Sequence, residues 1–320
     1  MNRIGTQIKC LVSILAFTSA MAQAVQAQSA VTCSGDADGD GQVIVSELVQ
    51  AVNNALEGCD LVPITLQFQA RVGDQPFACG MSYGGIGTSQ AEITPADFRF
   101  YVSNVRLLTP SGGEIALRLA QDGRWQHGNV ALLDFEDKTR PCNDGTMATN
   151  AQVRGIAPPG TYSGVRFVLG VPFDLNHQNA ATAPSPLNLT SMFWSWNGGY
   201  KFMRIDEAFD TVRVHLGSTG CQSGPGGSVA SCARPNRGEV MLTEFDPTSD
   251  VIVADLAALL ADSDLGVNHP DTTPGCSSDI EDTDCVSIFE NLGVNFSNGL
   301  PDPSRQSFLR VEKNDAPVSR

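Results

Sequence analysis

Residues 64–72 read Ile-Thr-Leu-Gln-Phe-Gln-Ala-Arg-Val, with an apolar side chain at every second position. Because side chains of an extended strand point alternately to opposite faces, this pattern predicts a strand with one face in a core. The same alternation recurs at 115–119, 165–171 and 211–217. Further predicted strands, rich in β-branched and aromatic residues, are 97–108, 129–135, 199–205 and 239–245.

Turn-forming clusters separate these strands, as at Pro110-Ser111-Gly112-Gly113 and Pro158-Pro159-Gly160. Helical patterns are confined to 46–57 and 254–261. Many strands with few helices between them predict an all-β fold, specifically an antiparallel β-sandwich-like domain over residues 63–300. Residues 301–320 are expected to form a polar tail.

The first 27 residues have the three parts of a secretory signal peptide. Arg3 and Lys9 give a positive start, Cys10 to Ala20 form an apolar core, and Val25-Gln26-Ala27 form a small-residue cleavage site. The apolar run is too short to span a bilayer, so no membrane insertion is expected. The signal predicts a protein of the periplasm or a secreted protein.

The chain is strongly acidic, with 35 Asp and Glu residues against 20 Lys and Arg and a formal net charge of −15. Such a surface repels nucleic acid and anionic membranes, so neither is an expected partner. It is compatible with cations as ligands.

Nine cysteines are present, and removal of the signal takes away Cys10. The even number that remains predicts four disulfides in an oxidising compartment. No CxxC occurs, which argues against a thiol redox enzyme, an iron–sulfur site or a zinc ribbon. Sequence neighbours suggest four pairs, although one sequence leaves the connectivity open: Cys33–Cys59, Cys79–Cys142, Cys221–Cys232 and Cys276–Cys285.

Residues 36–47 match the twelve-residue EF-hand loop, which binds calcium through oxygen ligands. The glycine at its sixth place, Gly41, permits the sharp turn. The predicted calcium ligands are Asp36, Asp38, Asp40, Gln42 and Glu47. Cys33 leaves no room for a helix that enters the loop, so residues 28–62 are expected to form a small EF-hand-like unit, closed by Cys33 and Cys59. A structural calcium site is therefore favoured over a sensor.

The chain has four histidines, of which His127, His177 and His215 lie in informative settings. His127 follows Trp125 by two residues, so both side chains should lie on one face of an extended segment. His215 lies on the polar face of the predicted strand 211–217, and His177 lies in a loop. An isolated histidine usually has an ordinary structural role, and no HExxH or similar metal motif supports these three.

Trp194 and Trp196 lie in an aromatic segment that could form a platform for a sugar or another ligand. Aromatic residues at strand spacing more often belong to a core. The sequence also lacks a GxSxG elbow, a P-loop and a complete GxGxxG, and no local motif supports a Ser-His-Asp triad. The chain is therefore not expected to be an enzyme.

Several phrases together resemble the MbnP-like periplasmic proteins, the four-cysteine partners of "metallo-mystery pair" systems. The resemblance extends in order over roughly residues 64–260 and excludes the predicted calcium unit. The phrases that carry it are Phe98–Val105, Trp125 with Ala131–Phe135, Gly170–His177, Ser191–Phe202 and Val214–Cys221.

This resemblance implies a β-rich protein that binds copper through histidines and a kynurenine made from a tryptophan. The oxidation is assigned to a partner dihaem protein of the cytochrome c peroxidase type, an MbnH-like protein. By position, Trp125 and His127 are similar to the family's tryptophan-x-histidine element. The further histidine is His215 or His177, and a strand would hold His215 more rigidly. The alternative hypothesis is a calcium-stabilised extracytoplasmic module that binds carbohydrate or protein.

Overall fold

The computed structural model describes residues 43–45, 48–49, 51–52, 61–225 and 228–313. The chain divides into two units, residues 1–59 and 60–320. In the first unit, the described residues 45, 48–49 and 51–52 are helical, in agreement with part of the predicted helix. The signal peptide, Cys33, Cys59 and most of the calcium loop, including all five predicted ligands, lie outside the described residues.

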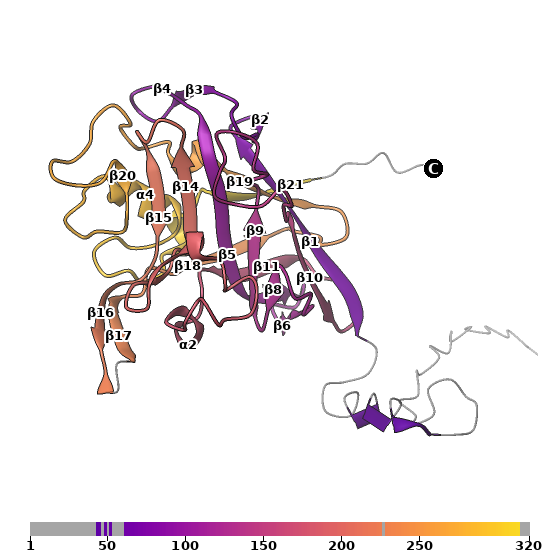
Figure 1. Cartoon of the computed structure of the whole chain (residues 1–320). Helices are drawn as coiled ribbons and strands as arrows, with labels where there is room; N and C mark the ends of the chain where they lie inside the picture. The colour runs from indigo at the N-terminus through magenta and orange to yellow at the C-terminus, as the bar shows by residue number, and fades with distance from the viewer. Residues whose placement is uncertain (1–42, 46–47, 50, 53–60, 226–227, 314–320) are drawn as a thin grey trace, which may run out of the picture. The chain divides into compact units, whose positions relative to one another are not determined.

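Two sheets form an all-β, sandwich-like body in the second unit (Figure 1). The smaller sheet has the order β21-β19-β1-β10-β7, and β2 pairs with β1. Its strands are β1 (Val62–Val72), β2 (Gln75–Pro76), β7 (Arg118–Leu119), β10 (Gln152–Ala157), β19 (Val251–Asp255) and β21 (Leu309–Glu312).

The larger sheet has the order β18-β11-β5-β14-β15-β20, and β6, β8 and β9 join it beside β5. Its strands are β5 (Pro95–Leu108), β6 (Glu114–Ala116), β8 (Gln126–His127), β9 (Val130–Asp134), β11 (Gly164–Leu169), β14 (Met203–Glu207), β15 (Arg213–Leu216), β18 (Gly238–Thr243) and β20 (Gly275–Cys276).

Shorter elements complete the described body. They are the hairpins β3 (Tyr83–Ile86) with β4 (Ala91–Ile93), β12 (Phe193–Ser195) with β13 (Gly199–Tyr200), and β16 (Thr219–Ser223) with β17 (Val229–Arg234), the helices α2 (Phe173–Asn176), α3 (Leu256–Leu259) and α4 (Cys285–Asn291), and the 3₁₀ turns η1 (Thr190–Met192) and η3 (Pro303–Arg305).

The predicted strands are present, but the sandwich is not purely antiparallel. β1 pairs with β19 in parallel, and β15 pairs with β20 in parallel. The sequence did not predict β19 or β20. Residues 251–255 are too uniformly apolar to show alternation, and residues 275–276 are too few. The expected polar tail also contributes to the fold: β21 pairs with β19, and Phe308 and Leu309 before and within it are buried.

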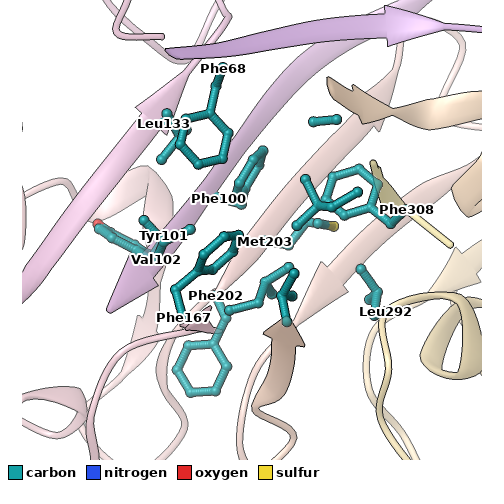
Figure 2. Close-up of a cluster of buried hydrophobic side chains, with 14 of the residues drawn as sticks. Phe68, Phe100, Tyr101, Val102, Leu133, Phe167, Phe202, Met203, Leu292 and Phe308 are labelled. Carbon is teal, nitrogen blue, oxygen red and sulfur yellow. The ribbon is translucent and has the colours of Figure 1, made fainter. Parts of the chain in front are cut away.

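The core lies between the two sheets and is built from aromatic side chains (Figure 2). Phe100 of β5 packs against Phe68 of β1 at a centroid distance of 6.4 Å, and against Phe308 at 5.5 Å. Phe167 of β11 lies 6.1 Å from Phe68. Alternation explains this arrangement, because every second residue of β1 and β5 enters the same layer.

A second layer covers the other face of the larger sheet, and residues 172–202 form it. The hydroxyl of Tyr101, on β5, donates to the carbonyl of Pro186 at 3.0 Å, and Tyr200 donates to the carbonyl of Leu187. The middle of β5 is therefore buried on both faces, so its polar side chains need partners inside the protein.

Three disulfides stabilise this body: Cys79–Cys142, Cys221–Cys232 and Cys276–Cys285. They are the pairs that sequence proximity suggested. No helix in the described part of the chain combines the length and apolarity that a bilayer crossing needs.

Candidate metal centre

His127 lies on β8, which pairs with β9 at an edge of the larger sheet, and Trp125 lies in the bend just before β8. The backbone of β8 pairs Gln126 with Ala131 and His127 with Val130. Gln126, which lies between the two side chains, points to the opposite face, where its amide nitrogen donates to the carbonyls of Ala120 and Arg154 at 2.8 Å each. Gln126 and His127 therefore point to opposite faces, as strand alternation requires, and the side-by-side placement of the Trp125 indole and the His127 imidazole stays a prediction.

A short turn fixes the entry to β8. One carboxylate oxygen of Asp122 accepts hydrogen bonds from the backbone N–H groups of Arg124, Trp125 and Gln126, at 2.9, 2.7 and 3.0 Å. The Arg124 guanidinium lies 4.9 Å from the centre of the Trp125 ring, a cation–π contact. The indole is half-buried and packs against the core. This arrangement holds Trp125 while leaving part of it open to solvent.

The His127 imidazole is half-buried and makes no hydrogen bond or ion pair with any other side chain or backbone group that the structure describes. Both ring nitrogens are therefore available. A metal-binding histidine needs one such nitrogen with its lone pair free.

His215 is in a different state, because its ring is fixed inside the sheet. It is 9% exposed, and its Nε2 lies 2.6 Å from a carboxylate oxygen of Asp206 on β14. Burial lowers the pKa of His215 and outweighs the opposite effect of Asp206. Burial opposes ionisation of Asp206, but hydrogen bonds from His215 and Arg204 and the positive charges beside it lower its pKa.

His215 borders a buried network of charged side chains that the sequence did not reveal. Arg99 and Asp97, both 1% exposed, form an ion pair with a hydrogen bond of 2.8 Å from Nε to Oδ1. Arg99 also donates to the Ser191 hydroxyl at 3.1 Å, and burial raises the pKa of nearby Asp134 to about 7. The alternation Asp97-Phe98-Arg99-Phe100 suggests an exposed polar face. The covering layer of residues 172–202 buries that face instead.

Three carboxylates of this network, from Asp97, Asp144 and Asp206, come within 4.8 Å of one another and could be mistaken for a cation site. The Arg204 guanidinium already lies among them and pairs with all three. A fixed positive charge therefore takes the place that a metal ion would need, and the cluster is an ion-pair network.

His177, the residue after α2, is fixed from several sides. Its Nδ1 lies 3.1 Å from the carbonyl oxygen of Trp196, and its Nε2 lies 3.1 Å from the Asn176 amide and 3.5 Å from Cys232 Sγ. Burial lowers the pKa of His177, so the ring is neutral at pH 7. It belongs to a cavity of about 700 Å³ that Phe173 and Trp196 also line.

The structure does not bring these three histidines together. His127 lies on β8 and His215 on β15, and the strands β9, β5 and β14 lie between them. Neighbouring strands are about 4.8 Å apart, so the four spacings separate the two residues by roughly 20 Å. No group of three or more His, Cys, Asp or Glu ligand atoms in the described residues includes His127 or His215. Of the predicted copper ligands, Trp125 and His127 are the two that are close in the chain, two positions apart at the start of β8.

Fold and site together define a disulfide-bonded, sandwich-like protein that carries a tryptophan–histidine pair on a sheet edge. The family model of MbnP matches residues 62–278, well over half of the chain, so the chain belongs to the MbnP family. The solved structure of MbnP from Methylosinus trichosporium is similar, with 29% sequence identity and a TM-score of 0.70. The match covers 79% of this chain and 99% of that chain. No curated protein sequence matches the chain.

Proposed function

We propose that this protein binds copper in an extracytoplasmic compartment, the periplasm or the medium, and that His127 and a kynurenine made from Trp125 hold the ion. The observation that carries the proposal is an imidazole without a partner among the described residues, two positions after a half-buried indole, in a member of the MbnP family. In this proposal the protein is not an enzyme, because Trp125 is the substrate of a partner.

The donor set suits copper. All cysteines in the described residues are paired in disulfides, so imidazole nitrogen is the natural ligand that remains for copper. The other predicted ligands are engaged elsewhere. His215 is hydrogen-bonded to Asp206 roughly 20 Å from His127, and His177 is hydrogen-bonded to the Trp196 carbonyl. We therefore centre the proposal on Trp125 and His127.

The proposed partner is a dihaem protein of the cytochrome c peroxidase type, which uses peroxide or dioxygen as the oxidant. Two oxygen atoms enter at the indole C2–C3 bond, which breaks to give N-formylkynurenine. Water then releases the formyl group as formate. The side chain gains one oxygen and loses one carbon overall, and the amine it uncovers can bind a metal.

Peptide mass spectrometry on protein from its native host tests this chemistry. The tryptic peptide from Trp125 to Lys138 should show the mass of kynurenine, and the unmodified mass should appear when the dihaem partner is deleted. An unmodified Trp125 in the native sample would contradict the kynurenine mechanism.

Copper titration of that native protein tests the ligand. His127→Ala should lose copper binding, whereas His269→Ala, which replaces a histidine outside the predicted set, should keep it. Equal affinities in the two variants would overturn the assignment of His127. His215→Ala and His177→Ala then show whether either residue contributes.

We further propose that the N-terminal unit binds calcium through Asp36, Asp38, Asp40, Gln42 and Glu47, on the sequence match to the EF-hand loop. Chelation of calcium should lower the melting temperature and leave bound copper in place. Loss of both metals together would contradict the separation of the two sites.

A second candidate function, a carbohydrate-binding module, is favoured by the cavity beside His177. Trp196 is 46% exposed and Phe173 is 39% exposed, which is unusual for large aromatic side chains, and Asp174, Gln178 and Asn179 supply polar groups around them. Under this hypothesis Trp196→Ala abolishes binding to a glycan array and His127→Ala does not. Absence of glycan binding by the wild-type protein would remove this candidate.

A further inference from the structure

The hairpin of β16 and β17 carries one disulfide at directly opposite positions, Cys221 and Cys232. In Figure 1 this hairpin extends beyond the end of the larger sheet. The two sulfur atoms and a ring nitrogen of His177 all lie within 4.8 Å of one another. These three atoms, two sulfurs and one imidazole nitrogen, can bind a soft metal when the sulfurs are thiolates.

His177 is held with Nε2 toward the sulfurs. Its Nδ1 lies 3.1 Å from the Trp196 carbonyl, which accepts a hydrogen bond and so places the ring proton on Nδ1. Nε2 then carries a lone pair, which accepts a hydrogen bond from the Asn176 amide at 3.1 Å and lies 3.5 Å from Cys232 Sγ. An ion bound at Nε2 would replace the Asn176 hydrogen bond. Phe173 packs edge-on against the ring at 5.2 Å. Metal-binding histidines are typically oriented in this way, by a backbone carbonyl on the nitrogen that does not bind.

Among the three described disulfides, Cys221–Cys232 is the one with both cysteines half-buried. In Cys79–Cys142 one cysteine is fully buried, and in Cys276–Cys285 both are. A cavity of about 340 Å³ reaches the disulfide, because Cys221 lines it together with Trp194. The cavity of about 700 Å³ reaches His177. A reductant and an ion can therefore approach from solvent.

We propose that reduction of Cys221–Cys232 creates a binding site for Cu(I), formed by the two thiolates and Nε2 of His177. A protein dithiol supplies two electrons and two protons, and is itself oxidised to a disulfide. The S–S bond breaks to give two thiols, and binding of the ion releases their protons. The geometry requires little movement, because the sulfurs need to separate only to about 4 Å, the spacing of two sulfurs that each lie about 2.3 Å from one ion.

This site is separate from Trp125 and His127, and it does not depend on the proposed function. It would make copper retention respond to the thiol–disulfide state of the compartment. Oxidation closes the S–S bond and removes both thiolates, so the same step that restores the disulfide releases the ion.

The test uses the full-length His127→Ala protein, so that copper at the first site is not counted. Cu(I) is titrated anaerobically against a chromogenic Cu(I) chelator, before and after treatment with reduced thioredoxin. Thiol alkylation and peptide mapping identify which disulfide was opened. Reduction should add one equivalent of Cu(I), with a thiolate-to-copper charge-transfer band in the ultraviolet.

The ligands are then tested one at a time. The additional equivalent should be absent in Cys221→Ser/Cys232→Ser. Its affinity should fall at least about tenfold in His177→Gln and stay unchanged in His269→Gln. The proposal is overturned if the double serine variant still binds the additional equivalent, or if His177→Gln leaves its affinity unchanged. It is also overturned if the additional equivalent is absent after confirmed reduction.

A second variant avoids the reductant. Cys221→Ser leaves the Cys232 thiol free beside His177, so this protein should bind Cu(I) through one sulfur and one nitrogen without any treatment. Addition of His177→Gln should weaken that binding. Equal affinities with and without His177→Gln would contradict the site.

Discussion

His127 and His215 lie on the same face of one sheet, but their side chains have different surroundings. His127, near the edge, is half-buried and has no partner among the described residues. His215 is buried and hydrogen-bonded to Asp206, within reach of the Arg99 network. Strand alternation therefore determines the face on which a side chain lies. The segments that cover that face, such as residues 172–202, determine whether the side chain is free to bind a ligand.

The largest loss of stability is expected from a substitution in the network of charged side chains beside His215. Arg99→Met should lower the free energy of unfolding by about 3–5 kcal/mol, because the buried Asp97 loses its hydrogen-bonded partner and keeps only the Arg204 guanidinium, at 3.3 Å. Arg106→Met is the matched control on the same strand. Its ion pair with Glu114 is half-exposed and is worth about 1 kcal/mol or less. Equal losses in urea unfolding would show that the network is not buried.

The next effect compares the two histidines directly. His215→Ala should cost about 1–3 kcal/mol of stability, because Asp206 loses a hydrogen-bond partner inside the protein. His127→Ala should cost about 0.5 kcal/mol or less, since no partner is lost. Thermal unfolding of both variants measures the difference. A larger loss in His127→Ala would mean that His127 has a structural role.

A smaller effect is expected at the turn before Trp125. Asp122→Ala removes one acceptor from three backbone N–H groups and should cost about 1 kcal/mol, comparable to the loss of a helix cap. Asp137→Ala, which removes the acceptor of the Thr139 N–H alone, should cost less. Urea unfolding gives both free energies, and the reverse order would contradict the role given to Asp122.

The smallest effect concerns pH. Because the folded pKa of His215 is below its ordinary value of 6.5, the unfolded chain binds more protons as pH falls below 6.5. Stability that His215 contributes at neutral pH is therefore lost as pH falls. His215→Gln should lessen this loss between pH 6.5 and 5 in urea titrations. If the free energy of unfolding depends on pH equally in the variant and the wild type, His215 does not cause this loss of stability.

Alternation and turn signals predicted the all-β class and most of the main strands, since these patterns follow from local geometry. The predicted strand 115–119 is instead two short strands, β6 and β7, which join different sheets. The prediction missed β10, β19 and β21. Val251–Asp255 is buried without alternation, and β21 depends on a pairing partner distant in sequence.

Local sequence predicted most of the strand pattern and suggested the Cys221–Cys232 and Cys276–Cys285 pairs. Each of these depends on residues close together in the chain. Tertiary structure alone decided that His215 is held by Asp206 and that His177 faces a disulfide. Those contacts arise from strand register and from the segment over the sheet, which join residues that sequence spacing does not relate.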